Sequence, residues 1–146
     1  MKRYYLAYGS NLNIEQMQWR CPTAKVVGTV VLPDYELLFK GSMTGAYLTI
    51  EKKENSSVPM AVWEVEAEDE KALDRYEGYP HFYYKKDLEL TNEEKRIKAF
   101  VYIMHEDMAL GLPTKAYVET CLAGYKAFGF DKKILLEAIE KSGKGI

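Results

Sequence analysis

The order of strand-like and helix-like segments most constrains the fold of this chain. A first strand is followed by a helix, several strands, a second helix, a β-hairpin and two last helices. Doubly wound parallel sheets need strands and helices in regular alternation, so this irregular order favours the α+β class. The expected strands are Arg3–Ala7 and residues 24–32, 35–40, 46–51, 58–65, 83–90 and 97–104. The expected helices are residues 13–19, Ala67–Glu77, Lys115–Phe128 and a last helix opened by Asp131.

Turn and capping residues set the boundaries of these segments. Pro33 and Asp34 predict a turn, and the polar residues 52–57 predict an exposed loop. The charged residues 92–96 join two strands as the turn of a hairpin. Thr114 suits the N-cap of the long helix, and Gly129 suits its C-terminal end.

Size and charge limit the class of protein. The chain has 146 residues, close to the commonest size for one domain, and shows no repeat or linker. We therefore predict a single domain over residues 1–146. The formal net charge of −2 argues against nucleic acid or an anionic membrane as partner.

The N-terminus and the cysteines indicate a cytoplasmic protein. The first residues lack the apolar segment of a signal peptide, and no apolar run approaches the ~20 residues of a membrane span. Cys21 and Cys121 are far apart and have no metal-binding spacing, so we expect idle thiols in a reducing compartment.

The segment YGSNL, residues 8–12, joins the first strand to the first helix. The first turn of a helix has unpaired N–H groups, and its dipole attracts anions. Gly9 permits an unusual turn and a close approach of a ligand to the backbone. The segment thus predicts a cradle for a small anion or carboxylate. The alternative is that Ser10, Asn11 or Asn13 merely caps the helix.

Glu77 is the candidate for proton transfer. It lies four residues after Leu73, so the two side chains share one helix face, and inward orientation of Leu73 turns Glu77 inward too. It also lies in the last turn before Gly78, at the negative end of the helix dipole. Both features raise the pKa of a carboxyl group towards the range useful for general acid–base catalysis. In the alternative, Glu77 turns to water or pairs with Arg75 or a lysine.

Other types of site have little support. His81 and His105 belong to no metal or triad motif, and Ser10 lacks the G-x-S-x-G context of a serine hydrolase. No nucleotide-binding motif occurs. These residues therefore predict no metal site. The 12 tyrosines, against 5 phenylalanines, suit either an aromatic pocket with hydroxyl groups or a β-rich fold.

Taken together, these segments resemble the γ-glutamylcyclotransferase family, including its avirulence-induced-gene-like bacterial members. The pairing of YGSNL with LD-x-x-EG at this separation is the specific signal, and either motif alone is weaker. The resemblance covers nearly the whole chain through AYGSNL (7–12), RCP (20–22), LPDYELLF (32–39), AYLTI (46–50), VPMAVWEV (58–65), LDRYEGYPHFY (73–83), YIM (102–104) and PTKAY (113–117).

The resemblance implies a compact mixed β-barrel with surrounding helices and a cofactor-free reaction. The α-amine of a small γ-glutamyl substrate attacks its own γ-carbonyl, giving pyroglutamate and a released amine or amino acid. Such an enzyme is an amide- or amidine-cleaving cyclotransferase, of carbon–nitrogen lyase or transferase type. Glu77 corresponds to the family's catalytic general acid and base. The implied substrate-binding residues are Tyr5, Leu6, Ala7, Tyr8, Gly9, Ser10, Asn11, Tyr83 and Tyr117.

Departures from the family pattern leave the substrate open. Met60 stands where many members have Gly, and Tyr84 and Lys85 follow Tyr83 where many have Arg. The released amine, glutathione as a substrate, and a homodimer all stay open. A different class of function, a non-catalytic binding or sensor protein for a γ-glutamyl or amino-acid ligand, is the alternative.

Overall fold

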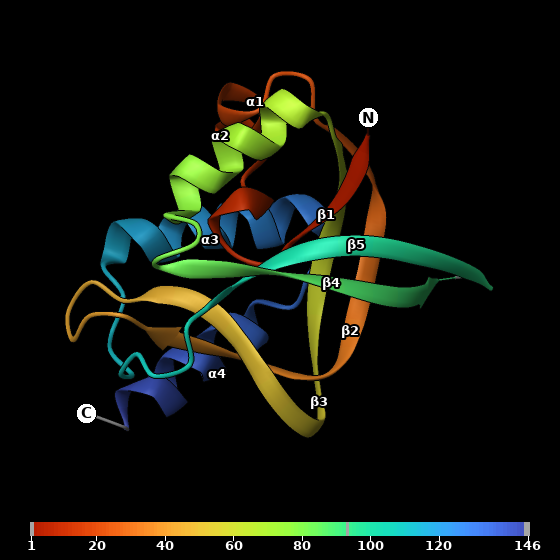
Figure 1. Ribbon diagram of the computed structural model, residues 1–146. Helices are drawn as coiled ribbons and strands as arrows, with labels where there is room; N and C mark the ends of the chain where they lie inside the picture. Colours follow the sequence, from red (N-terminus) through yellow and green to blue (C-terminus); the bar gives the residue numbers. More distant parts are fainter. Residues whose placement is uncertain (1, 93, 145–146) are drawn as a thin grey trace.

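The computed structural model describes residues 2–92 and 94–144 and contains one five-stranded sheet with helices packed around it (Figure 1). The strand order is β2-β3-β1-β5-β4. In chain order the elements are β1 (Arg3–Ala7), the 3-10 turn η1 (Ser10–Leu12), α1 (Ile14–Arg20), β2 (Lys25–Lys40), β3 (Tyr47–Val65), α2 (Ala67–Glu77), β4 (Tyr83–Asn92), β5 (Lys95–Met104), α3 (Lys115–Phe128) and α4 (Lys132–Gly143). The predicted α+β class is confirmed.

The sheet is mixed and open. The central strand β1 pairs antiparallel with β3 and parallel with β5, while β4 and β5 form the predicted antiparallel hairpin. The barrel implied by the resemblance is corrected in one respect. The strand order ends at β2 and β4, and among the described residues these two strands do not pair to close the sheet.

Two breaks predicted in the strands were wrong. Pro33 and Asp34 do not end a strand, because β2 continues through them with a register shift and Asp34 takes φ +62°. Residues 52–57 belong to β3 and are not a loop, although most of their side chains are exposed as predicted. The pairing of β2 with β3 decides this, because it shifts from Pro33 opposite Ser57 to Tyr35 opposite Lys52 and then resumes. Such an irregularity takes up turn residues without ending the ladder.

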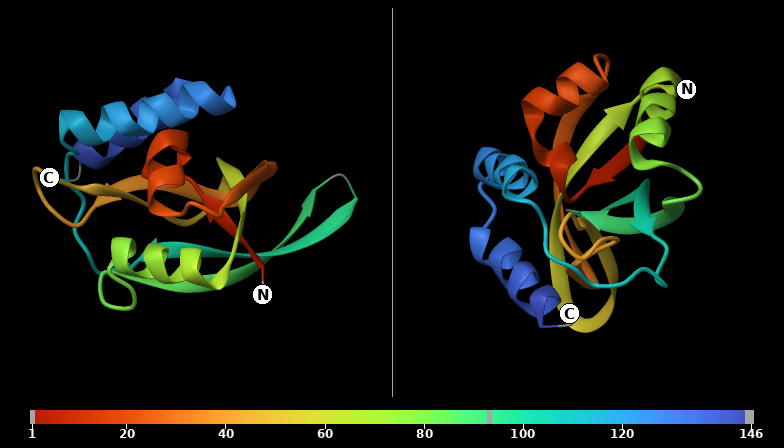
Figure 2. Two further views of the ribbon diagram at one scale, coloured as in Figure 1. Left: turned by 90° about the horizontal axis from the view of Figure 1, so that it is seen from above. Right: turned by 90° about the vertical axis from the view of Figure 1, so that its left-hand side faces the viewer.

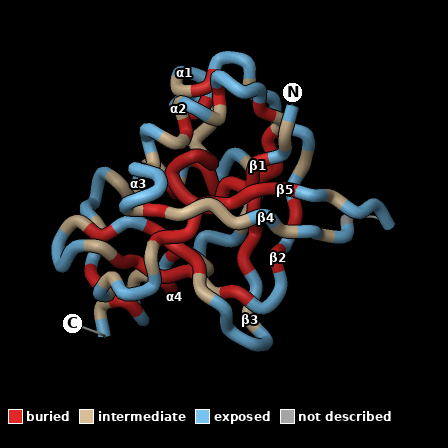
Figure 3. Tube along the Cα trace, viewed as in Figure 1, coloured by how far each residue is buried: buried red, intermediate tan, exposed pale blue. Residues whose placement is uncertain are grey.

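Helices α3 and α4 lie together along one side of the sheet (Figure 2). The buried stretches of the chain gather in the middle of the molecule (Figure 3). The largest fully buried side chains include Leu6, Trp63 and Phe100. Thr114 caps α3 by accepting a bond from the Tyr117 N–H, and Gly129 ends α3 in the left-handed conformation, both as predicted.

Helix α3 approaches η1 very closely at Gly124. A Cβ atom at Gly124 would lie 2.4 Å from Leu12 Cβ and 2.6 Å from the Leu12 carbonyl carbon. Leu12 is fully buried and belongs to η1, so no side chain fits between the helix and this turn. The absence of a side chain at Gly124 therefore fixes how near α3 comes to the segment that follows β1.

We expect Gly124→Ala to lower the free energy of unfolding by about 1–3 kcal/mol, the usual cost of overpacking. The sign is informative because alanine normally favours a helix interior over glycine by about 1 kcal/mol. Chemical denaturation measures the change. Gly143→Ala in α4 is the control, since its Cβ would meet only the end of the Leu112 side chain at 3.1 Å. Equal stability of the two variants would contradict the packing argument.

Candidate active site

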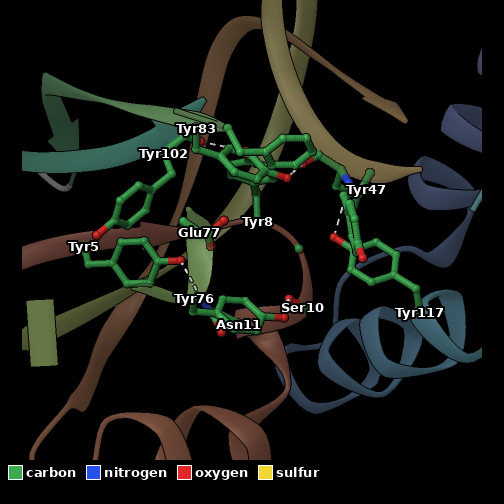
Figure 4. Close-up of a pocket in the computed structure, with 13 residues that line it drawn as sticks. Tyr5, Tyr8, Ser10, Asn11, Tyr47, Tyr76, Glu77, Tyr83, Tyr102 and Tyr117 are labelled. Carbon is green, nitrogen blue, oxygen red and sulfur yellow. Dashed lines mark hydrogen bonds between the residues drawn. The ribbon is translucent and has the colours of Figure 1, made fainter. Parts of the chain in front are cut away.

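The segment after β1 and the end of α2 border one cavity of about 240 Å³ (Figure 4). Most of the residues predicted for the site line it, and they come from β1, the following turn, α2, β4 and α3. Its wall consists of Tyr5, Tyr8, Gly9, Ser10, Asn11, Tyr47, Leu48, Tyr76, Glu77, Phe82, Tyr83, Tyr102 and Tyr117.

Two predicted residues do not line the cavity. Leu6 and Ala7 are buried in the hydrophobic core, with exposed fractions of 0% and 1%. Leu6 points to the opposite face of β1 from Tyr5, because successive strand residues alternate. Ala7 shares the face of Tyr5, but its short side chain is covered by the core. Any contact of Leu6 or Ala7 with a ligand is left to the backbone.

Glu77 lies near the centre of the lining residues, with tyrosine side chains around it (Figure 4). Leu73 is fully buried, and Glu77 on the same helix face turns inward as predicted. Burial raises the pKa of Glu77 from 4.5 to about 8, and the positive charge of Arg20 opposes this rise. Among the described residues Glu77 has no salt bridge, so the paired alternative fails. The site therefore holds a carboxyl group that gains and loses a proton near neutral pH.

Hydrogen bonds order the segment that faces Glu77. Ser10 Oγ lies 2.8 Å from the Tyr76 hydroxyl, and Asn11 Nδ2 donates to the Tyr5 hydroxyl at 2.9 Å. Asn13 is the residue that caps α1, by accepting from the Gln16 N–H. The capping alternative is thus true of Asn13, which leaves the side chains of Ser10 and Asn11 for the cavity wall.

Gly9 lies close to two other residues of the site. A Cβ atom there would lie 3.3 Å from the Tyr117 hydroxyl and 3.5 Å from Leu48. Tyr117 also accepts a hydrogen bond from the Leu48 N–H at 3.2 Å. The chain at Gly9 therefore passes directly beside the residues that connect α3 to β3.

The buried tyrosines have fixed hydroxyl groups. Tyr8 donates to the Tyr102 carbonyl and Tyr83 donates to the Leu48 carbonyl, each at 2.7 Å. Tyr102 donates to Asp74 at 2.6 Å. Burial is the main cause that raises the pKa of each of these hydroxyls above its ordinary value. They stay neutral at physiological pH, and each uses its only proton on a protein acceptor, which leaves oxygen lone pairs as its remaining hydrogen-bonding capacity.

Sequence reasoning missed five residues of the wall: Tyr47, Leu48, Tyr76, Phe82 and Tyr102. The surplus of tyrosine was a general signal for such a pocket, and Tyr76 is adjacent to Glu77. The spacing of tyrosines in the sequence does not show which of them line the cavity, because those that do come from five strands and helices beyond β1 and its following turn.

Metal and membrane sites were also sought in the structure. The described residues contain no group of three or more His, Cys, Asp and Glu side chains placed to hold a metal ion. Within that same part of the chain, each helix is too short or too polar to cross a membrane. Burial raises the pKa of the Cys21 and Cys121 thiols to about 12 each, so both are poor nucleophiles.

The fold and the cavity define an α+β protein with one protonatable carboxyl group enclosed by tyrosines. A family model described as "Gamma-glutamyl cyclotransferase, AIG2-like" matches residues 5–120, and the chain belongs to this family. The family predicted from the sequence is therefore confirmed. Family and fold support γ-glutamyl cyclotransferase activity in general. No curated protein sequence matches the chain significantly.

Solved structures give the same result for the fold. A structure named "Gamma-glutamyl cyclotransferase" is 26% identical with a TM-score of 0.80, covering 97% of this chain and 86% of that one. An uncharacterized protein from Homo sapiens is 27% identical with a TM-score of 0.79 and the same coverage. YkqA from Bacillus subtilis is 16% identical with a TM-score of 0.79, covering 99% of this chain and 55% of that one, and shows likeness of fold alone.

The raised pKa of Glu77 makes stability depend on pH in a defined direction. Between 4.5 and about 8 the folded state holds a proton that the unfolded state has released, so raising the pH favours unfolding. We expect the free energy of unfolding of the wild type to fall relative to Glu77→Gln across this range, by at most about 1.4 kcal/mol per pH unit.

Urea unfolding at a series of pH values measures this difference. Glu68→Gln is the control, because Glu68 is an exposed carboxyl on the same helix and should leave the wild-type pH dependence unchanged. Parallel stability curves for wild type and Glu77→Gln would show that Glu77 ionises normally.

Proposed function

We propose that this protein cyclises a γ-glutamyl compound to pyroglutamate and releases the attached amine or amino acid, with Glu77 as general acid and base. The observation that carries the proposal is the position of Glu77, a half-buried carboxyl with a pKa of about 8, which lines one small cavity together with the YGSN segment (residues 8–11). Family membership supports the reaction type.

Glu77 suits both proton transfers of this reaction. The α-ammonium group of the substrate lies beside a free α-carboxylate, so its pKa is above that of a peptide terminus, and the pKa of about 8 for Glu77 brings the two groups closer than an ordinary carboxyl would. The carboxylate takes a proton from the α-nitrogen as that nitrogen bonds to the γ-carbonyl carbon. That proton passes to the leaving nitrogen as its bond to that carbon breaks. The α-nitrogen sheds a second proton as it becomes the ring amide, and Glu77 passes this second proton to the released amine. Glu77 ends each cycle in its starting state.

The YGSN segment suits the developing negative charge. Among the described residues, the backbone hydrogen bonds of this turn are those from the Leu12 N–H to the Gly9 carbonyl and from the Asn13 N–H to the Ser10 carbonyl. The N–H groups of Ser10 and Asn11 belong to the first turn of η1, which has no intrahelical acceptor. We assign them to the oxyanion of the tetrahedral intermediate or to the substrate carboxylate.

The tyrosines suit the recognition of the γ-glutamyl group. The hydroxyl oxygens of Tyr8, Tyr83 and Tyr102 can accept from an ammonium group, because their own protons are committed elsewhere. Tyr5 accepts a bond from the Asn11 side chain, so its proton is free for a substrate oxygen. Such contacts hold a flexible chain folded back on itself, which is the geometry that cyclisation needs.

We expect Glu77→Gln to lower kcat/KM by at least about 100-fold, the lower range for loss of general acid–base catalysis. The assay measures pyroglutamate from γ-glutamyl-amino acids, a γ-glutamylamine and glutathione, with Glu68→Gln as control. Calorimetry on the same compounds tests whether the Gln variant still binds. Full activity in Glu77→Gln would refute the role of Glu77, and binding without product in every variant would favour the sensor function.

The pH dependence of kcat/KM tests the shared proton directly. The reaction needs one proton on the pair formed by Glu77 and the α-amine, so it fails when both are protonated or when neither is. We therefore expect a bell-shaped profile with its maximum between the pKa of about 8 for Glu77 and the higher pKa of the substrate ammonium. A flat profile between pH 6 and 9, measured with initial rates at low substrate concentration, would contradict this mechanism.

A further inference from the structure

Arg20, the last residue of α1, contacts both halves of the cavity wall without lining the cavity. Its guanidinium group lies over the ring of Tyr76, with the central carbon 3.4 Å from the ring centre. Its Nη1 atom donates a hydrogen bond to the side-chain oxygen of Asn11. The side chain is half-buried.

Both partners of Arg20 continue into the site. Asn11 donates through its other side-chain atom to the Tyr5 hydroxyl at 2.9 Å, and Tyr5 lies in the cavity wall. Tyr76 bonds through its hydroxyl to Ser10 at 2.8 Å and immediately precedes Glu77 on α2. One cation thus joins the YGSN segment to the helical turn that carries Glu77.

We propose that Arg20 is a positioning residue, which holds the YGSN segment and the last turn of α2 in the relative geometry that the reaction needs. The proposal rests on the proposed function, in which these two parts hold the substrate and move the protons. Arginine suits this task better than lysine, since its planar fork stacks on a ring and donates a directed hydrogen bond at once.

The charge of Arg20 has a second consequence at Glu77. The titratable or charged side chains that face Glu77 are Arg20 on α1, Tyr76 on α2, and Tyr5, Tyr8, Tyr83, Tyr102 and Tyr117 from the strands, the first turn and α3. Burial raises the pKa of Glu77, and the positive charge of Arg20 lowers it. Arg20 therefore keeps the pKa of Glu77 closer to neutral pH than burial alone would.

Substitutions of Arg20 can separate its positioning of the two segments from the effect of its charge on the pKa of Glu77. Arg20→Met keeps much of the aliphatic length but removes the charge and the donor. Arg20→Lys keeps the charge but lacks the planar fork. Arg75→Met is the matched control, because Arg75 adjoins Tyr76 on the same helix, is exposed, and has no side-chain hydrogen bond or ion pair with the described residues.

The experiment records kcat and KM against pH for the four proteins, with near-UV circular dichroism to verify folding. We expect Arg20→Met to lower kcat/KM at pH 7 by about 10- to 100-fold and to move the acid limb of the profile to higher pH. Arg20→Lys should keep the acid limb in place and lower kcat. Arg75→Met should match the wild type.

Two NMR measurements keep this test independent of turnover. The titration of the Glu77 carboxyl carbon, assigned with Glu77→Gln, should move to higher pH in Arg20→Met. The side-chain amide signal of Asn11 should change in both Arg20 variants. If the wild type forms no pyroglutamate, the proposed function fails while these signals still decide the role of Arg20. Glu77 titration and Asn11 signals in Arg20→Met equal to those of Arg75→Met would overturn the inference.

Discussion

The pairing of β1 on both of its edges is the constraint on which the rest of the structure depends. β1 lies between β3 and β5, with Tyr5 opposite Trp63 on one side and Phe100 on the other. A strand bonded on both sides cannot slip in register without turning its core residues to the wrong face. The end of β1, and with it the YGSN segment, is thereby fixed beside residues of β3, β4 and β5 that lie far away in the sequence.

The site depends on a second constraint, the burial of one carboxyl group without a salt-bridge partner among the described residues. A buried charge is costly, and the protein meets this cost by letting Glu77 hold its proton up to a pKa of about 8. The tyrosines around it are apolar enough to exclude water and polar enough to meet a ligand. The environment that destabilises the ionised carboxylate also brings the pKa of Glu77 into the range that suits proton transfer near neutral pH.

Much of this arrangement could be read from local sequence signals. The helices α2 and α3 begin and end where capping residues and periodicity place them, because Gly78, Thr114 and Gly129 act through contacts with their near neighbours. The inward orientation of Glu77 followed from its spacing to Leu73. The two failures in β2 and β3 share a cause, since the antiparallel ladder shifts register at Asp34 and residues 53–56 and then resumes, which local turn preference does not predict.

The sequence by itself determined the α+β class, the family, the two motifs and the identity of the proton-transfer residue as a prediction, because each rests on local patterns or on motif pairs. Only the tertiary structure decided which tyrosines enclose Glu77, that Leu6 and Ala7 belong to the core, and that Arg20 reaches both Asn11 and Tyr76. All three are questions of contact between residues from separate elements. They follow from strand register and from the close approach of α3 at Gly124, neither of which short-range spacing encodes.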